Sequence, residues 1–124
     1  LKRAREAVEQ SYAPYSGYQV GAALETAEGA IFSGSNVENA NYSNSVHAEE
    51  LAISIAVAEG HRSFERIAVS SSPRDGVTPC GACRQSLSEF CDDDLRIVCE
   101  GEDAPATYTL GELLPNTITS EHLK

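Results

Sequence analysis

Two cysteines stand three positions apart in the stretch PCGAC at residues 79–83, directly after a proline. Thiols at this spacing suit a redox dithiol, half of a structural zinc site or half of a catalytic zinc site. We expect Cys80 and Cys83 to lie at the start of a helix that follows a strand. The positive end of the helix dipole there favours thiolate over thiol. That setting suits a metal and a redox couple equally, so the pair alone leaves the three chemistries open.

A zinc site needs at least one more protein ligand, and His47 is the best placed of the remaining candidates. It opens a second expected helix, with Glu49 two residues later. Because side chains on a helix lean toward its N-terminus, both can reach a point just beyond the end of that helix. The other candidates are expected to be buried apolar residues or surface residues away from the pair: Cys91, Cys99, His61 and His122.

Three protein ligands would leave one tetrahedral position for water, which is the arrangement of catalytic zinc sites. A carboxylate that lies beside the metal without binding it can take a proton from that water. Glu49 could fill this role, although an acid in the first turn of a helix, taken alone, is more simply a cap.

The pattern of the whole chain is an alternation of helices and strands without repeats or linkers. The stripe Leu1, Ala4, Val8 and Tyr12 predicts a first helix, which APYSG at 13–17 ends. The later elements are expected in this order: a hairpin over residues 20–34, a helix buried all round from Leu51 to Ala58 and ended by Gly60, a strand over 66–70, a helix over 80–90 with Leu87 and Phe90 inside, a strand over 95–99, a strand over 106–110 and a helical turn over 111–115. This order predicts one α/β domain over residues 1–124, a mixed sheet with helices packed on it.

Composition limits the classes of partner. The chain has 19 acidic and 9 basic residues and a net charge of −10, so polynucleotides would be repelled and we expect no nucleic-acid partner. No apolar run approaches the length of a membrane span and no leader pattern precedes the fold, so we expect no membrane partner and a cytoplasmic location. Cytosolic thiols stay reduced, which favours a metal over disulfides for the cysteine pair.

Together, HAE at 47–49 and PCGAC at 79–83 form the H-x-E…P-C-x-x-C signature of the zinc deaminases. From about Ala4 to Pro115 the chain resembles one branch of that superfamily, the small homotetrameric cytidine deaminases. The matching stretches are SYAPYSGYQVGAAL, GSNVENANY, HAEE, PCGACRQSLSEFC and ELLP.

The resemblance implies a three-layer α/β/α sandwich on a five-stranded mixed sheet, assembled as a homotetramer. It implies one zinc ion per chain, held by His47, Cys80 and Cys83, whose bound water ionises and attacks C4 of cytosine, with Glu49 moving the protons. The implied activity is hydrolysis of cytidine and deoxycytidine to uridine and deoxyuridine in pyrimidine salvage.

The resemblance also implies how a nucleoside substrate is held. Asn36 and Glu38 of the NVEN motif would hydrogen-bond the sugar hydroxyls. The Ala48 amide and a backbone carbonyl near residues 72–73 would contact the base. Tyr18 stands where the family usually has phenylalanine and is expected among the substrate-binding residues.

Further departures from the family pattern bear on the detail. His47 stands where the small enzymes usually have cysteine, Glu50 where they usually have arginine, and Ile118 near a position where a phenylalanine stacks on the base in a neighbouring subunit. A deaminase of another amino-pyrimidine or modified nucleoside, such as the blasticidin deaminases, is therefore the alternative. A thioredoxin-like redox protein is more remote, since the chain lacks tryptophan and a proline between the two cysteines. A non-catalytic zinc module is equally remote, since no fourth ligand is placed to bind the metal.

Overall fold

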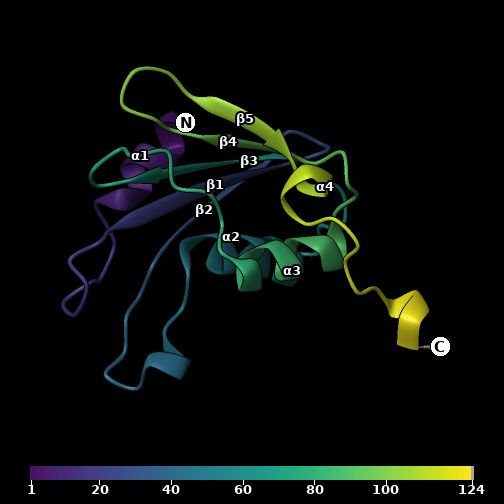
Figure 1. Ribbon diagram of the computed structural model, residues 1–124, viewed down its shortest axis with the longest axis horizontal. Coiled ribbons are helices and arrows are strands. Elements are labelled where there is room, and N and C mark those ends of the chain that lie inside the picture. The colour runs from purple at the N-terminus through teal and green to yellow at the C-terminus, as the bar shows by residue number, and fades with distance from the viewer. Residues whose placement is uncertain (124) are drawn as a thin grey trace.

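The computed structural model describes residues 1–123, which form a five-stranded sheet with helices on both faces (Figure 1). Lys124, the last residue of the expected domain, lies outside the described residues. The strands are β1 (Val20–Thr26), β2 (Ile31–Ser35), β3 (Phe64–Ser71), β4 (Arg96–Cys99) and β5 (Ala106–Thr109). The α-helices are α1 (Lys2–Val8), α2 (Ala48–Ala58), α3 (Gly81–Phe90) and α4 (Leu110–Leu113), with short 3₁₀ helices at Tyr42–Asn44 and Ser120–Leu123.

The sheet is mixed, with the strand order β2-β1-β3-β4-β5. β1 runs antiparallel to β2 and β3, β3 and β4 are parallel, and β5 is antiparallel to β4. A parallel pair needs a crossover connection, and α3 supplies it between β3 and β4. The expected hairpin and the five-stranded mixed sheet are confirmed.

The register brings the start of β1 and the ends of β2 and β3 together at one end of the sheet. Gly21 at the start of β1 pairs with Ser35 at the end of β2, and Val20 pairs with Ser71 at the end of β3. The chain that leaves β2 leads to α2, and the chain that leaves β3 leads to α3. Both helices therefore begin beyond the same end of the sheet, where β2 and β3 terminate.

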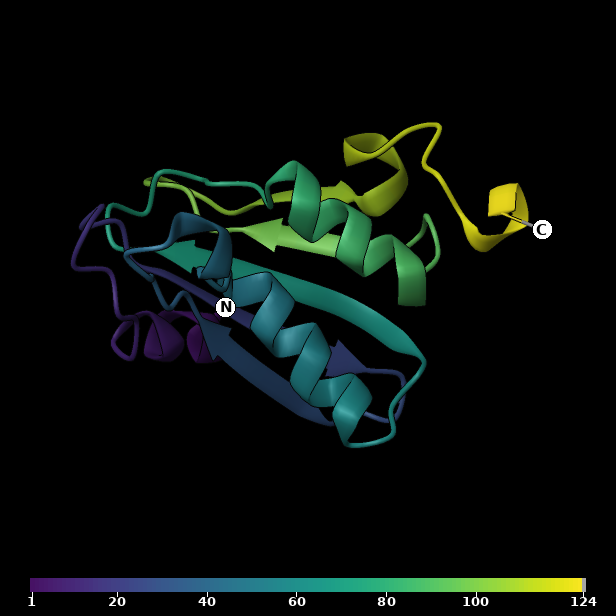
Figure 2. The same ribbon diagram turned by 90° about the horizontal axis from the view of Figure 1, so that it is seen from below.

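The helices form two layers, with α1 on one face of the sheet and α2 and α3 side by side on the other (Figure 2). Two glycines in the sheet allow α1 and α2 to pack close against it. A Cβ atom at Gly21 would lie 2.2 Å from the carbonyl oxygen of Ala4 in α1, and one at Gly34 would lie 2.6 Å from that of Ala48 in α2. This is the three-layer α/β/α sandwich that the family resemblance implies.

The main core lies between the sheet and the layer of α2 and α3. Alternate residues of the strands point into it, as the two-residue period of a strand requires. Its large, fully buried aliphatic side chains are Leu24, Ile67, Leu87, Ile97 and Leu110. No helix within residues 1–123 combines the length and the apolar character needed to cross a membrane.

Three details of the expected helices are wrong. α1 ends at Val8, and Tyr12 lies beyond it in extended backbone that bridges to Val37, with its side chain 58% exposed. Phe90 was expected inside but is 37% exposed, and Ile55 of the helix expected to be buried all round is 37% exposed. The reason is that α2 and α3 are the outer layer of this chain, so each buries only the side that faces the sheet.

Candidate active site

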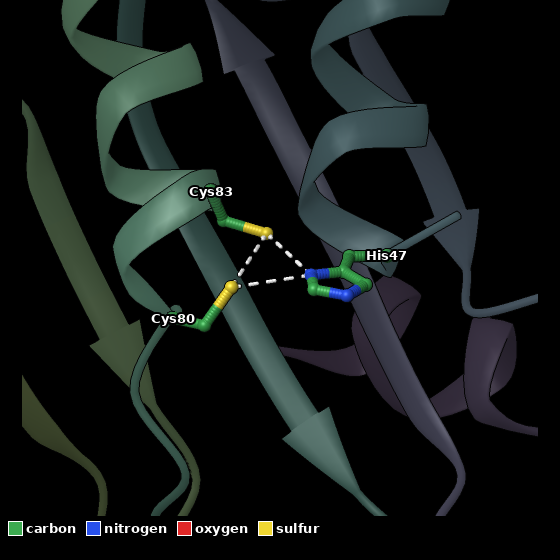
Figure 3. A group of neighbouring side chains, drawn as sticks. All are labelled: His47, Cys80 and Cys83. Carbon is green, nitrogen blue, oxygen red and sulfur yellow. Dashed lines mark hydrogen bonds between the residues drawn. The ribbon is translucent and has the colours of Figure 1, made fainter. Parts of the chain in front are cut away.

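Three side chains that could bind a metal converge where α2 and α3 begin (Figure 3). The His47 Nδ1 atom lies 3.2 Å from the Cys80 Sγ atom and 3.2 Å from the Cys83 Sγ atom, and the two sulfur atoms are 3.6 Å apart. Within residues 1–123 this is the one such group of histidine, cysteine and acidic side chains. The sequence predicted all three members.

The convergence follows from the helix starts. His47 is the N-cap residue of α2, Cys80 is the N-cap residue of α3, and Cys83 lies in the first turn of α3. Both helices begin beyond the same end of the sheet, so their first turns face one point. The positive ends of two helix dipoles therefore meet there and favour negatively charged sulfur.

The geometry and chemistry of the triad fit zinc. Around a tetrahedral zinc ion with bonds of about 2.1 Å to nitrogen and 2.3 Å to sulfur, ligand atoms are separated by about 3.5–3.8 Å. The observed triangle needs to open by only a few tenths of an ångström. Burial, and then the negative charge of Glu49, raise the pKa of the Cys83 thiol well above its ordinary value, so a bound cation is needed to stabilise the thiolate.

Glu49 lies beside the triad in a protected position. Its side chain is only 5% exposed, and no other side chain of the described residues hydrogen-bonds its carboxylate. Burial raises the pKa of this carboxyl above its ordinary value. A carboxyl with a raised pKa holds and releases a proton nearer to neutral pH, which suits a general acid and base.

Two charged neighbours of the triad stabilise its backbone and do not touch the sulfur atoms. The Glu50 carboxylate accepts a hydrogen bond from the His47 amide at 3.1 Å, which caps the first turn of α2. The Arg84 guanidinium donates to the carbonyl oxygens of Pro79 and Leu113, each at 2.7 Å, and to the Thr78 hydroxyl at 3.1 Å. The glutamate three residues after an N-cap is a signal of capping that the sequence contains, whereas the distant contact with Leu113 leaves no local signal.

His47 and Cys80 of the triad, together with Glu49, line a cavity of about 530 Å³, and Cys83 is buried behind them. This volume is in the usual range for small-molecule sites, about 300–1,000 Å³. The remaining predicted substrate-binding residues all line the cavity: Tyr18, Asn36, Glu38 and Ala48. From the loop after β3, where a base contact at residues 72–73 was expected, it is Val77 and Thr78 that line the cavity.

Asn36 and Glu38 also hold one wall of the cavity in place. The Asn36 side chain donates to the Tyr18 carbonyl oxygen and accepts from the Val20 amide, both at 2.9 Å. The Glu38 carboxylate accepts from the amides of Tyr15 and Ser16, both at 3.0 Å. These bonds fix the chain segment that leads into β1, a role that the sequence motif did not reveal.

Two tyrosines that the sequence analysis missed stand at the cavity. The rings of Tyr15 and Tyr42 line it and meet edge to face, with their centroids 6.3 Å apart. Ile118, which was considered for stacking on a base, is 55% exposed and its carbonyl oxygen accepts a hydrogen bond from Gln85 at 3.1 Å. Exposed aromatic and aliphatic side chains at a cavity and a chain end suit contact with a ligand or a second chain.

Comparison with known proteins agrees with this site. The family model described as the cytidine and deoxycytidylate deaminase zinc-binding region matches residues 1–99. A protein named cytidine deaminase from Sporosarcina psychrophila is 40% identical over 125 residues, which cover 99% of this chain and 91% of that protein.

Solved structures agree with the sequence comparison. The crystal structure of cytidine deaminase from Burkholderia pseudomallei superposes with a TM-score of 0.90 at 40% identity and covers 94% of both chains. The crystal structure of cytidine deaminase from Mycobacterium tuberculosis gives a TM-score of 0.83 at 32% identity and covers 94% of this chain and 92% of that one. The two superpositions cover 94% of this chain, and the similarity does not favour the redox interpretation of the two cysteines.

Proposed function

Since this chain belongs to the cytidine and deoxycytidylate deaminase family, we propose that its cavity binds cytidine or deoxycytidine and hydrolyses the bond between C4 and the amino nitrogen of the base. The products are uridine or deoxyuridine and ammonia. The observation that carries this proposal is a ligand triad at one cavity, which His47, Cys80 and the buried carboxylate of Glu49 line.

His47, Cys80 and Cys83 would hold one zinc ion per chain, the metal of this family. A zinc ion with three protein ligands lowers the pKa of a water in its open position to near neutrality. Glu49 would move the protons: it accepts one from the attacking water, delivers it to ring N3 and helps to protonate the departing amino group. The oxygen–C4 bond forms, the C4–nitrogen bond breaks, and the carboxylate ends in its starting state.

The walls of the cavity would orient the nucleoside. Glu38 and Asn36 lie at the cavity with polar atoms that can also reach sugar hydroxyls. The Ala48 amide is in the first turn of α2, where backbone N–H groups have no acceptor within the helix, so it is free to donate to the base. The Tyr18 ring supplies an apolar surface beside Val20.

The test is a screen of nucleosides and nucleotides for ammonia release and loss of the cytosine absorbance band. We expect nucleosides to be preferred, because the cavity lining within the described residues includes no lysine or arginine that could bind a phosphate. Zinc content is measured on the same samples. A higher kcat/KM for dCMP than for deoxycytidine, or no turnover of any cytosine nucleoside by the zinc-loaded protein, would refute the proposed substrate class.

We further propose that the chain works as a homotetramer. The exposed Ile55 and Phe90 on α2 and α3 and the exposed Ile118 near the C-terminal end support self-association, since burial of such side chains stabilises subunit contacts. Sedimentation equilibrium measures the assembled mass. A monomer at micromolar concentration would contradict this proposal.

Cytoplasmic location and a role in pyrimidine salvage belong to the same proposal. All four cysteines are free thiols, as is usual in a reducing compartment, and hydrolysis of a free nucleoside is a salvage reaction. Fractionation of cells that express the chain would test the location.

A further inference from the structure

The Tyr18 side chain joins two segments that meet at the cavity. Its hydroxyl donates to the Asp75 carboxylate, with the phenol oxygen 2.8 Å from both carboxylate oxygens. Tyr18 lies in the segment before β1 and lines the cavity, whereas Asp75 lies in the loop after β3 and is exposed. The hydrogen bond therefore ties the ring to a residue that stands outside the cavity.

Asp75 is held firmly for a loop residue. Its carboxylate also accepts a hydrogen bond from the Ser71 hydroxyl at 2.9 Å, so it is fixed to the end of β3. Its two neighbours, Arg74 and Gly76, have φ angles of 51° and 75°, in the left-handed region that a residue with a side chain rarely adopts. The Gly76 amide donates to the Glu100 carbonyl oxygen at 2.9 Å, which fixes the loop on its other side.

The loop that contains Asp75 continues into the metal site. Val77 and Thr78 line the cavity, and Cys80 follows two residues later as a member of the ligand triad. The neighbouring segment leads into β1, where Val20 pairs with Ser71 at the end of β3, and both Tyr18 and Val20 line the cavity. The Tyr18–Asp75 hydrogen bond thus joins the ring of Tyr18 to the loop that continues to Cys80, beyond the last backbone hydrogen bond between the two segments.

We propose that Asp75 is a positioning residue for nucleoside binding, which holds the Tyr18 ring and the loop leading to Cys80 at the separation that the substrate needs. This inference rests on the proposed function. The pKa directions of the two groups agree with this bond. The hydrogen bond from Tyr18 lowers the pKa of Asp75, and burial raises the pKa of Tyr18. At neutral pH the acceptor is therefore charged and the donor is protonated. With phenylalanine at position 18 there would be no hydroxyl to donate a hydrogen bond to the Asp75 carboxylate.

The test is a double-mutant cycle on cytidine turnover with Tyr18→Phe, Asp75→Ala and the double variant. We expect Asp75→Ala to raise KM about three- to tenfold and to change kcat less than about twofold, because a hydrogen bond to a charged group that positions the substrate affects binding more than the chemical step. In the Tyr18→Phe background, Asp75→Ala should leave KM unchanged. Asp75→Asn keeps an oxygen acceptor and should restore KM to within about twofold of the wild-type value.

The matched control is Asp103→Ala, which removes an exposed aspartate from the loop between β4 and β5. An Asp75→Ala enzyme with the KM of this control, or effects of Tyr18 and Asp75 that multiply independently, would overturn the inference. If Asp75→Ala is recovered unfolded, the other two single variants decide. A raised KM in Tyr18→Phe with a wild-type KM in Asp75→Asn supports the proposed role of Asp75. An unchanged KM in Tyr18→Phe refutes it. A wild-type chain that releases no ammonia would refute the proposed function itself, whereas an active wild-type chain with independent effects refutes only the role of Asp75.

Discussion

Adjacent glutamates at the start of α2 have opposite surroundings. Glu50 turns back to cap the helix through the His47 amide, while Glu49 is buried beside the ligand triad without a partner side chain among the described residues. The capping position that an acid in a first turn usually fills is thus already filled. Glu49 does not cap the His47 amide, and its burial beside the triad supports the proposed role in proton transfer.

Replacement of Glu49 by glutamine should abolish most turnover and leave the protein folded and loaded with zinc. Glutamine has nearly the same shape but cannot carry protons, and a general acid and base typically contributes about 10²–10⁴-fold to the rate. The measurements are kcat on cytidine and zinc per chain by atomic absorption. A variant that retains zinc and at least half of the wild-type kcat would show that another group moves the protons.

Replacement of Glu50 should reduce stability rather than abolish the chemistry. Glu50→Ala removes the acceptor for the His47 amide and should lower the free energy of unfolding by about 0.5–1 kcal/mol, as for other helix caps. Glu50→Gln retains an oxygen acceptor and serves as the control. Urea denaturation of the two variants checks this, and equal losses for both would mean that the charge of Glu50, rather than its hydrogen bond, stabilises α2.

At the scale of the elements, Glu100 joins three parts of the fold just beyond β4. Its buried carboxylate accepts hydrogen bonds from Arg5 of α1 and, at 2.7 Å, from the Ser70 hydroxyl of β3, and it pairs with Arg74 of the loop after β3 at 3.5 Å. Burial alone would raise the pKa of this carboxyl. The hydrogen bonds from Ser70 and Arg5 and the charges of the two arginines outweigh that effect and hold the pKa below its ordinary value.

This arrangement predicts a pH-dependent part of the stability. A carboxyl whose pKa is lower in the folded state stabilises the fold above its unfolded pKa, about 4.3, and this contribution is lost as the pH falls through the folded pKa. Glu100→Gln should therefore cost about 1–2 kcal/mol at pH 7 and progressively less below pH 4. Urea midpoints from pH 3 to pH 7 measure the difference, and a constant difference across that range would contradict the assignment.

The sequence predicted the elements well where periodicity is strong and less well at boundaries. The two-residue alternation of Val20, Ala22 and Leu24 identified β1 correctly. Tyr12 fits the helical stripe by spacing, but its backbone is used in a bridge to the segment after β2, a long-range contact that no local pattern contains. Phe90 is apolar and lies at the end of α3, so its exposure depends on which layer the helix occupies.

The same division applies to the site. His47, Cys80 and Cys83 were predictable because a metal restricts the types and spacing of its ligands, and Glu49 because the H-x-E signature contains it. The interaction of Arg84 with Leu113 and that of Tyr18 with Asp75 join segments 29 and 57 positions apart. Arginine, tyrosine and aspartate are common surface residues, so only the fold reveals these pairs.

The whole molecule carries excess negative charge. Against a net charge of −10, the ion pairs between arginine and glutamate in the described residues involve Arg5, Arg66, Arg74 and Arg96. Repulsion among the excess acidic groups opposes the compact state and is screened by salt. The net electrostatic contribution at low ionic strength should therefore be destabilising.

Added salt should accordingly stabilise the chain. We expect the thermal midpoint to rise from about 0.01 M to about 0.5 M NaCl, as the screening length falls from about 30 Å to below 10 Å. The double variant Glu102→Lys/Asp103→Lys changes the net charge from −10 to −10 + 4 = −6 at an exposed loop and should show a smaller rise. Identical salt dependence in both proteins would mean that net charge does not cause the rise, and a midpoint that falls with salt would mean that the ion pairs outweigh the repulsion.

The ligand triad also has a topological consequence. His47 and Cys80 are 33 positions apart, so an ion bound to both closes the chain through α2 and β3 into a ring and lowers the conformational entropy of its open states. The amides of Leu51 and Arg84, which donate to the carbonyl oxygens of His47 and Cys80, report the first turns of the two helices. Hydrogen exchange at these two amides should be slow and closely matched with zinc bound, and after chelation it should become faster and separate into two rates, while amides in the centre of β1 keep their protection.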